Sequence, residues 1–182
     1  MSDAARNIPV IETERLILRG WEQRDVSFMT RFFSSDESKF WGGPLSEGEA
    51  WRRLIAFAGQ WQINGYGQWA VELRDTGETI GLCGLWHPID FPEAEMTYAL
   101  LPDHYGKGYA FEAVKPAIAH VYQALGWTTL ASMIEADNAP SVKLATKLGA
   151  AFERDFDFEG RTLQVWRHLS PDKFFERFEV AA

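Results

Sequence analysis

The clearest chemical pattern in the chain lies in residues 102–113, which read Pro-Asp-His-Tyr-Gly-Lys-Gly-Tyr-Ala-Phe-Glu-Ala. A predicted strand ends just before this segment, a loop containing Gly106 and Gly108 follows, and a predicted helix begins at once. The start of a helix offers unpaired backbone N–H groups and the positive end of the helix dipole, so it favours an anion. Glycine lets the backbone approach a bulky pyrophosphate because it has no Cβ, and Lys107 adds positive charge at the rim. The segment predicts a phosphate-binding loop, although an ordinary strand-to-helix turn that uses glycine would give the same pattern.

The spacing of the glycines argues against two common nucleotide-binding motifs. No Gly-Lys-Ser/Thr follows at the distance that a P-loop requires. The dinucleotide-binding fingerprint needs a third glycine, and Phe111 stands where that glycine is expected. Hydride transfer and nucleoside triphosphate hydrolysis therefore lose support, and a nucleotide-dependent enzyme that uses this loop is kept as an alternative.

The histidines and the single cysteine form no reactive cluster in the sequence. Cys83 lies among small residues in an apolar segment and is expected in the core, without an intramolecular disulfide. No group of His, Asp and Glu has the spacing of metal ligands, so no metal is predicted. His104 adjoins the glycine loop and is expected to be exposed. The remaining histidines are expected at the surface or at strand edges: His87, His120 and His168.

Length and composition favour one globular domain over residues 1–182. The net charge is 18 − 26 = −8, which disfavours nucleic acid and would favour a cationic small molecule or a basic peptide. No apolar run approaches the roughly 18 residues that span a membrane. The first ten residues lack a basic segment followed by an apolar core, so no secretory signal is expected. A cytoplasmic location is the resulting expectation.

The order of the predicted elements indicates a mixed sheet covered by helices. Ser46 and Glu49 form a capping box at the start of one helix, which Asn64-Gly65 should end. Gly81 and Gly84 leave room for another backbone to approach their strand. The predicted strands are 15–19, 68–73, 79–86, 95–101, 128–135, 151–157 and 162–168. The predicted helices are 22–33, 46–64, 110–125, a short one that Asn138 caps and that ends before Gly149, and a short terminal one at 174–178.

Four segments together resemble the GNAT N-acetyltransferase superfamily. The run Tyr105-Gly106-Lys107-Gly108-Tyr109-Ala110 resembles its acetyl-CoA pyrophosphate loop, and more narrowly that of the RimJ/RimL branch of ribosomal-protein N-terminal acetyltransferases. Residues 13–19, 80–85 and 138–150 resemble the first strand, the third strand and the helix after the cofactor-binding strand. The likeness covers about residues 11–168. Tyr105 departs from the Gln or Arg that usually opens the loop, but an aromatic residue is common there in the RimJ/RimL branch.

The resemblance implies an α/β fold of the mixed α+β kind. Its central mixed sheet would have seven strands flanked by helices, with a V-shaped splay between the fourth strand, 95–101, and the fifth, 128–135. Acetyl-CoA would be the co-substrate. Its pyrophosphate would bind the loop from Tyr105 to Ala110, mainly through backbone amides. Its pantetheine arm would lie in the splay, and the residues assigned to it are Ala99, Leu100, Leu101 and Asn138.

The resemblance also implies direct attack of a neutral amine on the thioester in a ternary complex. The protein must then position the amine, accept a proton and help the thiolate leave. Ser141 would donate a hydrogen bond or proton to the sulfur, although it could instead only stabilise the first helical turn. Glu95 is the leading proton acceptor and Glu135 the second. A water reached through polar groups is the other possibility.

The acceptor would be a primary amine, either a protein N-terminus or a small molecule such as an amino acid, polyamine or drug-like amine. Its pocket would involve the two early helices, the loop of residues 41–44 and the hairpin around 156–161, with Trp41 and Glu135 as substrate-binding residues. The alternative is a non-catalytic acyl-CoA-binding or sensing module of the same fold. The chain would be a monomer or a homodimer, and the terminal phenylalanines could cover the core or form a contact: Phe174, Phe175 and Phe178. Five tryptophans could line the pocket, although several must belong to the core: Trp41, Trp51, Trp61, Trp69 and Trp86.

Overall fold

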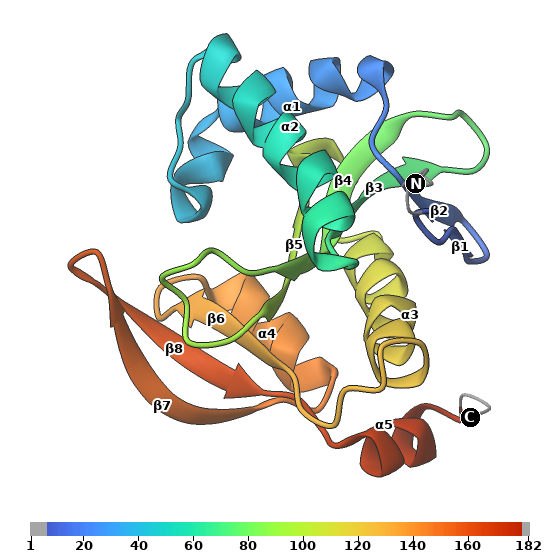
Figure 1. Ribbon diagram of the computed structural model, residues 1–182, viewed down its shortest axis with the longest axis vertical. Helices are drawn as coiled ribbons and strands as arrows, with labels where there is room; N and C mark the ends of the chain where they lie inside the picture. Colours follow the sequence, from blue (N-terminus) through green and yellow to red (C-terminus); the bar gives the residue numbers. More distant parts are fainter. Residues whose placement is uncertain (1–6, 180–182) are drawn as a thin grey trace, which may run out of the picture. The chain divides into compact units, whose positions relative to one another are not determined.

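The computed structural model describes residues 7–179 and contains one mixed sheet with helices (Figure 1). The strands follow the order β1-β2-β3-β4-β5-β6-β8-β7 across the sheet. Within the described part of the chain, no helix has the length and apolar character needed to cross a membrane.

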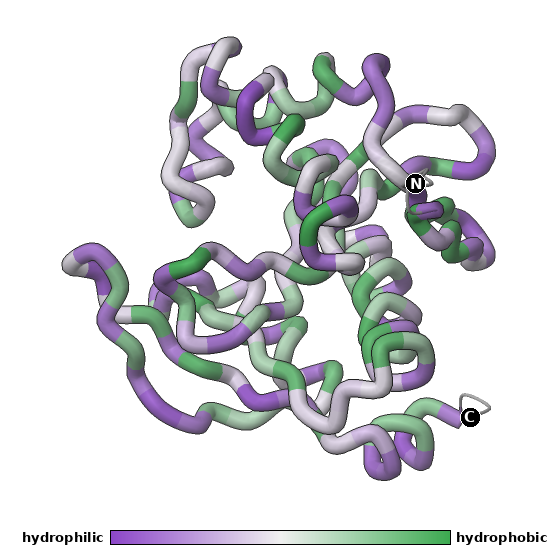
Figure 2. The backbone as a smooth tube through the Cα atoms, in the orientation of Figure 1, coloured by the Kyte–Doolittle hydropathy of each residue, from purple (hydrophilic) through white to green (hydrophobic). Residues whose placement is uncertain are grey.

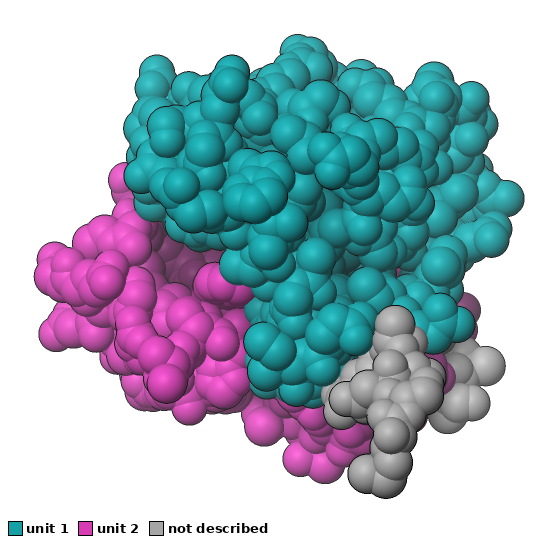
Figure 3. Space-filling view, turned by 45° about the horizontal axis from the view of Figure 1, so that its top comes forward, with its two compact units in different colours: residues 1–84, 98–109 teal, residues 85–97, 110–182 magenta. Residues whose placement is uncertain are grey.

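The chain divides into two compact units (Figure 3). The first runs to Gly84 and also contains Tyr98–Tyr109, whereas the second contains Leu85–Thr97 and the chain from Ala110 onward. Strand β5, Glu95–Leu100, therefore contributes its first three residues to the second unit and its last three to the first. The expectation of one domain over the whole chain stays a prediction.

The first unit holds an antiparallel part of the sheet. Residue Leu18 of β2 faces Val71 of β3, and Val71 faces Gly81 of β4. A Cβ on Gly81 would lie 2.4 Å from the carbonyl oxygen of Ala99, so β5 can approach here only because this residue is glycine. The close approach expected at this position is confirmed. The strands of this part are β1 Ile11–Glu12, β2 Leu16–Arg19, β3 Gln68–Leu73 and β4 Thr79–Trp86.

Two helices of the first unit pack on each other, α1 (Val26–Phe33) and α2 (Glu47–Asn64). The capping box of α2 is confirmed: the Ser46 amide donates to Glu49 at 2.9 Å, and the Glu49 amide donates to the Ser46 hydroxyl at 3.4 Å. Gly65 ends the helix in a left-handed conformation, φ +78°. The apolar face of α2 is buried through Leu54, Phe57 and Trp61.

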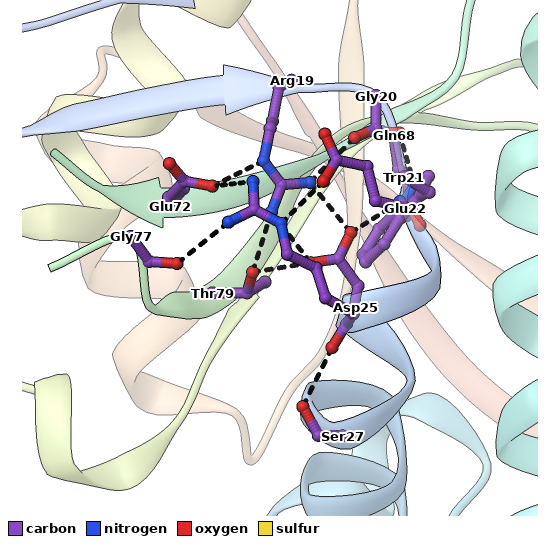
Figure 4. Close-up of polar contacts among 11 residues, drawn as sticks. Arg19, Gly20, Trp21, Glu22, Asp25, Ser27, Gln68, Glu72, Gly77 and Thr79 are labelled. Atoms are coloured by element: carbon purple, nitrogen blue, oxygen red, sulfur yellow. Dashed lines mark hydrogen bonds and ion pairs between the residues drawn. The ribbon is translucent and has the colours of Figure 1, made fainter.

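An ion network ties β2 and β3 to the segment before α1 (Figure 4). Arg19 donates two hydrogen bonds of 2.9 Å to Asp25 and one of 2.6 Å to Glu72. Arg24 reaches the same Glu72 carboxylate from the solvent side, at 2.7 Å. Burial alone would raise the pKa of Asp25, but hydrogen bonds from Arg19 and Thr79 lower it below its ordinary value. Every charge in the buried part of this network therefore has a counter-ion.

The second unit holds the other end of the sheet. Strand β6 (Ala131–Glu135) pairs antiparallel with β8 (Arg161–Arg167), and β8 pairs with β7 (Ala151–Phe158) at the sheet edge. Its helices are α3 Tyr109–Gln123, whose first residue belongs to the first unit, α4 Ala139–Lys147 and α5 Pro171–Phe178.

Apolar contacts hold these helices in the second unit. Hydrophobic residues recur along α3 (Figure 2), and Ala145 of α4 packs with Ile134 of β6. Phe174 of α5 is fully buried, with its ring 5.7 Å from that of Tyr122. Of the two roles left open for the terminal phenylalanines, Phe174 therefore has the core role.

The mixed α/β sheet expected from the sequence is confirmed, with one strand more than the seven expected. The additional strand is β1, only two residues long. It pairs with β2 through Ile11↔Leu18 and Glu12↔Ile17. Two residues are too few to show the alternation of apolar and polar side chains that predicts a strand.

We expect Asp25→Asn to lower the free energy of unfolding by about 3 kcal/mol or more, because it removes the bidentate counter-ion of buried Arg19. Arg24→Gln, at the exposed side of the same network, should cost no more than about 1 kcal/mol. Urea denaturation of both variants checks this, and equal losses would contradict the network's buried character.

Candidate functional site

The glycine loop has the backbone conformation that the sequence predicted. Gly106 and Gly108 have φ values of +73° and +85°, a region that L side chains rarely adopt. The residues from Tyr105 to Gly108 are exposed, and α3 begins at Tyr109. The first turn of α3 thus follows directly after a loop in which Gly106 and Gly108 carry no Cβ. This arrangement can accept an anion such as a phosphate group.

Arg15 anchors this loop, and the sequence analysis did not assign it a role. Its guanidinium donates to the carbonyl oxygen of Lys107 at 3.1 Å and lies 4.5 Å from the centroid of the Tyr109 ring. Arg15 lies 92 residues before Lys107 in the chain, so no local spacing could reveal the contact. The anchor brings a second positive charge to the loop beside Lys107.

The hydroxyl of Tyr105 extends this anchoring to the segment after α1, where it donates to Glu37 at 3.4 Å. Partial burial and the neighbouring Glu37 raise the pKa of Tyr105 to about 12. The phenol therefore stays neutral near pH 7, and it can act there as a donor.

The end of β5, in the same unit, is buried. Ala99, Leu100 and Leu101 are at most 7% exposed. The Leu101 amide donates to Ile80 at 2.8 Å, and its carbonyl oxygen accepts from the His104 amide at 3.0 Å. Both backbone groups of Leu101 therefore have partners within the protein.

Trp41, the first residue of the loop 41–44, packs in an aromatic cluster. Its ring meets those of Phe32 and Phe33 edge-on, at 6.5 and 6.4 Å. Trp61 and Trp69 are core residues, 3% and 1% exposed. Trp51 is 48% exposed, so the five tryptophans do not share one environment.

In the second unit, the parallel contact between β5 and β6 registers one residue pair, Glu95↔Ala131. Beyond this pair, side chains make hydrogen bonds between the two strands. The Glu95 carboxyl accepts from the amide of Met133 at 2.8 Å, and the Ser132 hydroxyl donates to the carbonyl oxygen of Met96 at 2.6 Å. The strands are thus joined by side-chain contacts where a regular ladder would use backbone groups.

Glu95 is the most strongly perturbed carboxyl of this site. Burial raises its pKa to about 8, against a smaller lowering by the hydrogen bond from Met133. The group is only 7% exposed. Such a carboxyl can exchange a proton near neutral pH, as a general base must.

Two expectations about histidines were wrong. His168 is 5% exposed, with Nε2 3.0 Å from the Ser132 hydroxyl; since that hydroxyl gives its proton to Met96, the ring must donate. Burial, and then the charge of Arg167, lower the pKa of His168 to about 4, so it is neutral. His104 is 8% exposed and lies 3.6 Å from Glu78. Burial of both side chains depends on contacts with residues distant in the chain, Ser132 for His168 and Glu78 for His104.

The residues after β6 lie at the start of α4. Asn138 caps the helix, because its side-chain oxygen accepts from the amide of Ser141 at 3.3 Å. Glu135 forms an ion pair of 2.8 Å with Arg161 on the neighbouring strand. Asn138 and Ser141 therefore take part in the helix start, and Glu135 has a counter-ion.

The predicted site residues fall into two groups, one in each unit. Trp41, the end of β5 and the loop up to Tyr109 belong to the first unit. The second unit contains the others: Glu95, Ala110, Glu135, Asn138 and Ser141.

A family model, the acetyltransferase (GNAT) domain, matches residues 15–151. The chain belongs to the GNAT acetyltransferase family. It is an acetyltransferase, and GNAT enzymes use acetyl-CoA.

Relatives agree with this assignment. The chain is 32% identical over 146 residues to the uncharacterized N-acetyltransferase YoaA of Bacillus subtilis (strain 168), which covers 78% of this chain and 82% of that protein. The acetyltransferase from Agrobacterium tumefaciens str. C58 superposes with a TM-score of 0.82 at 29% identity, over 93% of this chain and 99% of that one. Spermidine N-acetyltransferase from Vibrio cholerae, solved with CoA and spermine, shares the fold with a TM-score of 0.71 at 22% identity, over 90% and 99% of the two chains.

The raised pKa of Glu95 predicts a pH-dependent stability of the acetyltransferase. Below about pH 4.5 the carboxyl is protonated in both the folded and the unfolded state. Between that value and about 8 only the unfolded state loses the proton, so the contribution of Glu95 to the free energy of unfolding should fall as pH rises. The lowered pKa of His168 contributes the opposite trend below about pH 6.5. Glu95→Gln should abolish this decrease, which we expect to be on the order of a few kcal/mol.

Denaturation of the wild type, Glu95→Gln and the exposed control Glu47→Gln at several pH values measures the effect. A Glu95→Gln variant with the same pH slope as the wild type would show that Glu95 is not buried in its neutral form.

Proposed function

We propose that the acetyltransferase transfers the acetyl group of acetyl-CoA to a primary amine by direct attack in a ternary complex. The observation that carries this proposal is the exposed loop with two glycines at positive φ, followed directly by the start of α3. Its geometry fits the pyrophosphate of CoA, which belongs to the co-substrate of the family.

The loop from Tyr105 to Ala110 would bind the pyrophosphate through backbone amides, with Lys107 and Arg15 supplying positive charge. The pantetheine arm would pair with backbone groups near Ala99 and Leu100. Leu101 is also assigned to this arm, but its amide and carbonyl are already engaged within the protein. We therefore expect Leu101 to contribute mainly its side chain.

Glu95 and Ser141 would carry the proton transfers. The amine nitrogen forms a bond to the acetyl carbon, the carbon–sulfur bond breaks, and the ammonium proton passes to Glu95 or to a water that relays it. Ser141 would donate a hydrogen bond to the departing sulfur, and Asn138 would hold the pantetheine arm. Glu95 is favoured over Glu135 as base, because Glu135 is ion-paired with Arg161 and the pKa of Glu95 is raised by burial.

The acceptor would be a protein N-terminus or a small amine, and Trp41 and Glu135 remain the residues predicted to bind it. Relationship to the RimJ/RimL branch, a cytoplasmic location and a monomeric or homodimeric state remain predictions from the sequence. So does the absence of a bound metal. A non-catalytic acyl-CoA sensor of the same fold is the alternative, since an intact loop suits both.

We expect Gly106→Ala to weaken acetyl-CoA binding about tenfold or more, because its Cβ would project from the amide surface that holds the pyrophosphate. Gly126→Ala is a matched control: its φ is +70°, and like Gly106 it has no atom within 4 Å of a built Cβ. Titration calorimetry gives both dissociation constants. Equal affinities of the two variants for acetyl-CoA would show that the loop is not part of the acetyl-CoA site.

We expect amines to trigger release of CoA thiol from acetyl-CoA, and Ser141→Ala to slow kcat about tenfold while leaving acetyl-CoA affinity unchanged. Ser141→Thr keeps a hydroxyl and should retain more activity. Thiol detection across an amine panel measures this. Tight acetyl-CoA binding without amine-dependent release, and with no effect of Ser141→Ala, would favour the sensor.

A further inference from the structure

Arg53 lies beside the loop proposed to hold the acceptor. It projects from α2, and its guanidinium carbon is 5.4 Å from the centroid of the Phe33 ring. The ring of Trp41 packs edge-on against the same Phe33. A Cβ built on Gly42 would be 3.9 Å from Nη2 of Arg53, so the cation reaches the backbone of this loop.

This arginine has no acidic partner among residues 7–179, although it is half-buried. Burial lowers the pKa of Arg53, and no carboxylate opposes that effect. Two other arginines that are partly or fully buried have acidic partners: Arg19 binds Asp25, and Arg167 binds Glu93 at 2.6 Å. The pKa values of Arg19 and Arg167 are raised by these partners.

The nearest acidic residue at helical spacing from Arg53 is Glu49, but its carboxylate binds Ser46 instead. Glu49 lies four residues before Arg53, a spacing that favours a helical ion pair. Its carboxylate instead accepts from the amide and the hydroxyl of Ser46 at 2.9 and 2.6 Å, closing the capping box. The positive charge of Arg53 is thus left for an external anion.

We propose that Arg53 binds an anionic group, a carboxylate or a phosphate, on the acceptor amine. This inference rests on the proposed function, because it concerns the substrate of that reaction. A guanidinium presents two parallel N–H donors that match either oxyanion. Trp41 would pack against the body of the same molecule. The acceptor class is then an amine that also carries a negative charge, such as a free amino acid, even though the protein's net charge of −8 would by itself favour a purely cationic acceptor.

The test compares acceptors that differ only in the anionic group. An amino acid is paired with its carboxamide, and 2-aminoethyl phosphate is paired with ethanolamine. For each pair, kcat/KM is measured at one pH for the wild type, Arg53→Gln, Arg53→Lys and Arg52→Gln. For each variant, kcat/KM for the charged acceptor is divided by kcat/KM for the neutral one, and this ratio is compared with the wild-type ratio. Differences in pKa between the two amines then cancel.

We expect the wild type to prefer the charged member of at least one pair. Arg53→Gln should lower that preference about tenfold or more, in line with loss of a charge-assisted hydrogen bond. Arg53→Lys should lower it less. Arg52→Gln, an exposed neighbour on the same helix, should leave it unchanged. The acceptor pair whose preference falls in Arg53→Gln shows whether Arg53 binds a carboxylate or a phosphate.

Several outcomes would overturn the inference. An unchanged preference in Arg53→Gln would do so while leaving the proposed acetyl transfer intact. Weaker acetyl-CoA binding in Arg53→Gln without a change in preference would place Arg53 against the co-substrate. If no amine releases CoA from the wild type, the proposed function itself fails and this inference falls with it.

Discussion

The contact between β5 and β6 is the constraint on which the second half of the structure depends. Backbone groups of a buried strand need partners, and here the regular parallel ladder registers one pair. Glu95 and Ser132 supply the next hydrogen bonds from their side chains, to Met133 and Met96. The cost is a carboxyl buried where its charge is disfavoured. The same burial raises the pKa of Glu95 to about 8, which suits its proposed role as a base.

The glycine loop shows a second constraint, because it is exposed and is still held in place by contacts with distant residues. Its own residues from Tyr105 to Gly108 are exposed and bury little surface. Arg15, the residue before β2, contacts the loop through the Lys107 carbonyl and the Tyr109 ring. The ion network around Arg19 fixes that strand in turn. Contacts of Arg15 and Arg19 thus connect the loop to the ion network.

Local patterns predicted the elements well, since caps and glycines act on their neighbours. Ser46 and Glu49 predicted the start of α2, and Gly106 and Gly108 predicted the loop before α3. Contacts between distant segments were beyond that reasoning. Neither the burial of His168 beneath Ser132 nor the anchoring by Arg15 leaves a local signal. Arg53 illustrates the same limit, because its lack of a counter-ion emerges only when Glu49 is seen bound to Ser46.

The central claim is that the loop before α3 is built for CoA, and a thermal-shift titration with acetyl-CoA, CoA, ATP and NAD tests it most directly. A ligand at 100 times its dissociation constant adds about 2.7 kcal/mol to the free energy of unfolding, or a shift of roughly 5–10 °C for a chain of this size. We predict stabilisation by acetyl-CoA and CoA alone. Stabilisation by ATP or NAD that acetyl-CoA does not displace, or no shift with either CoA species, would contradict the account.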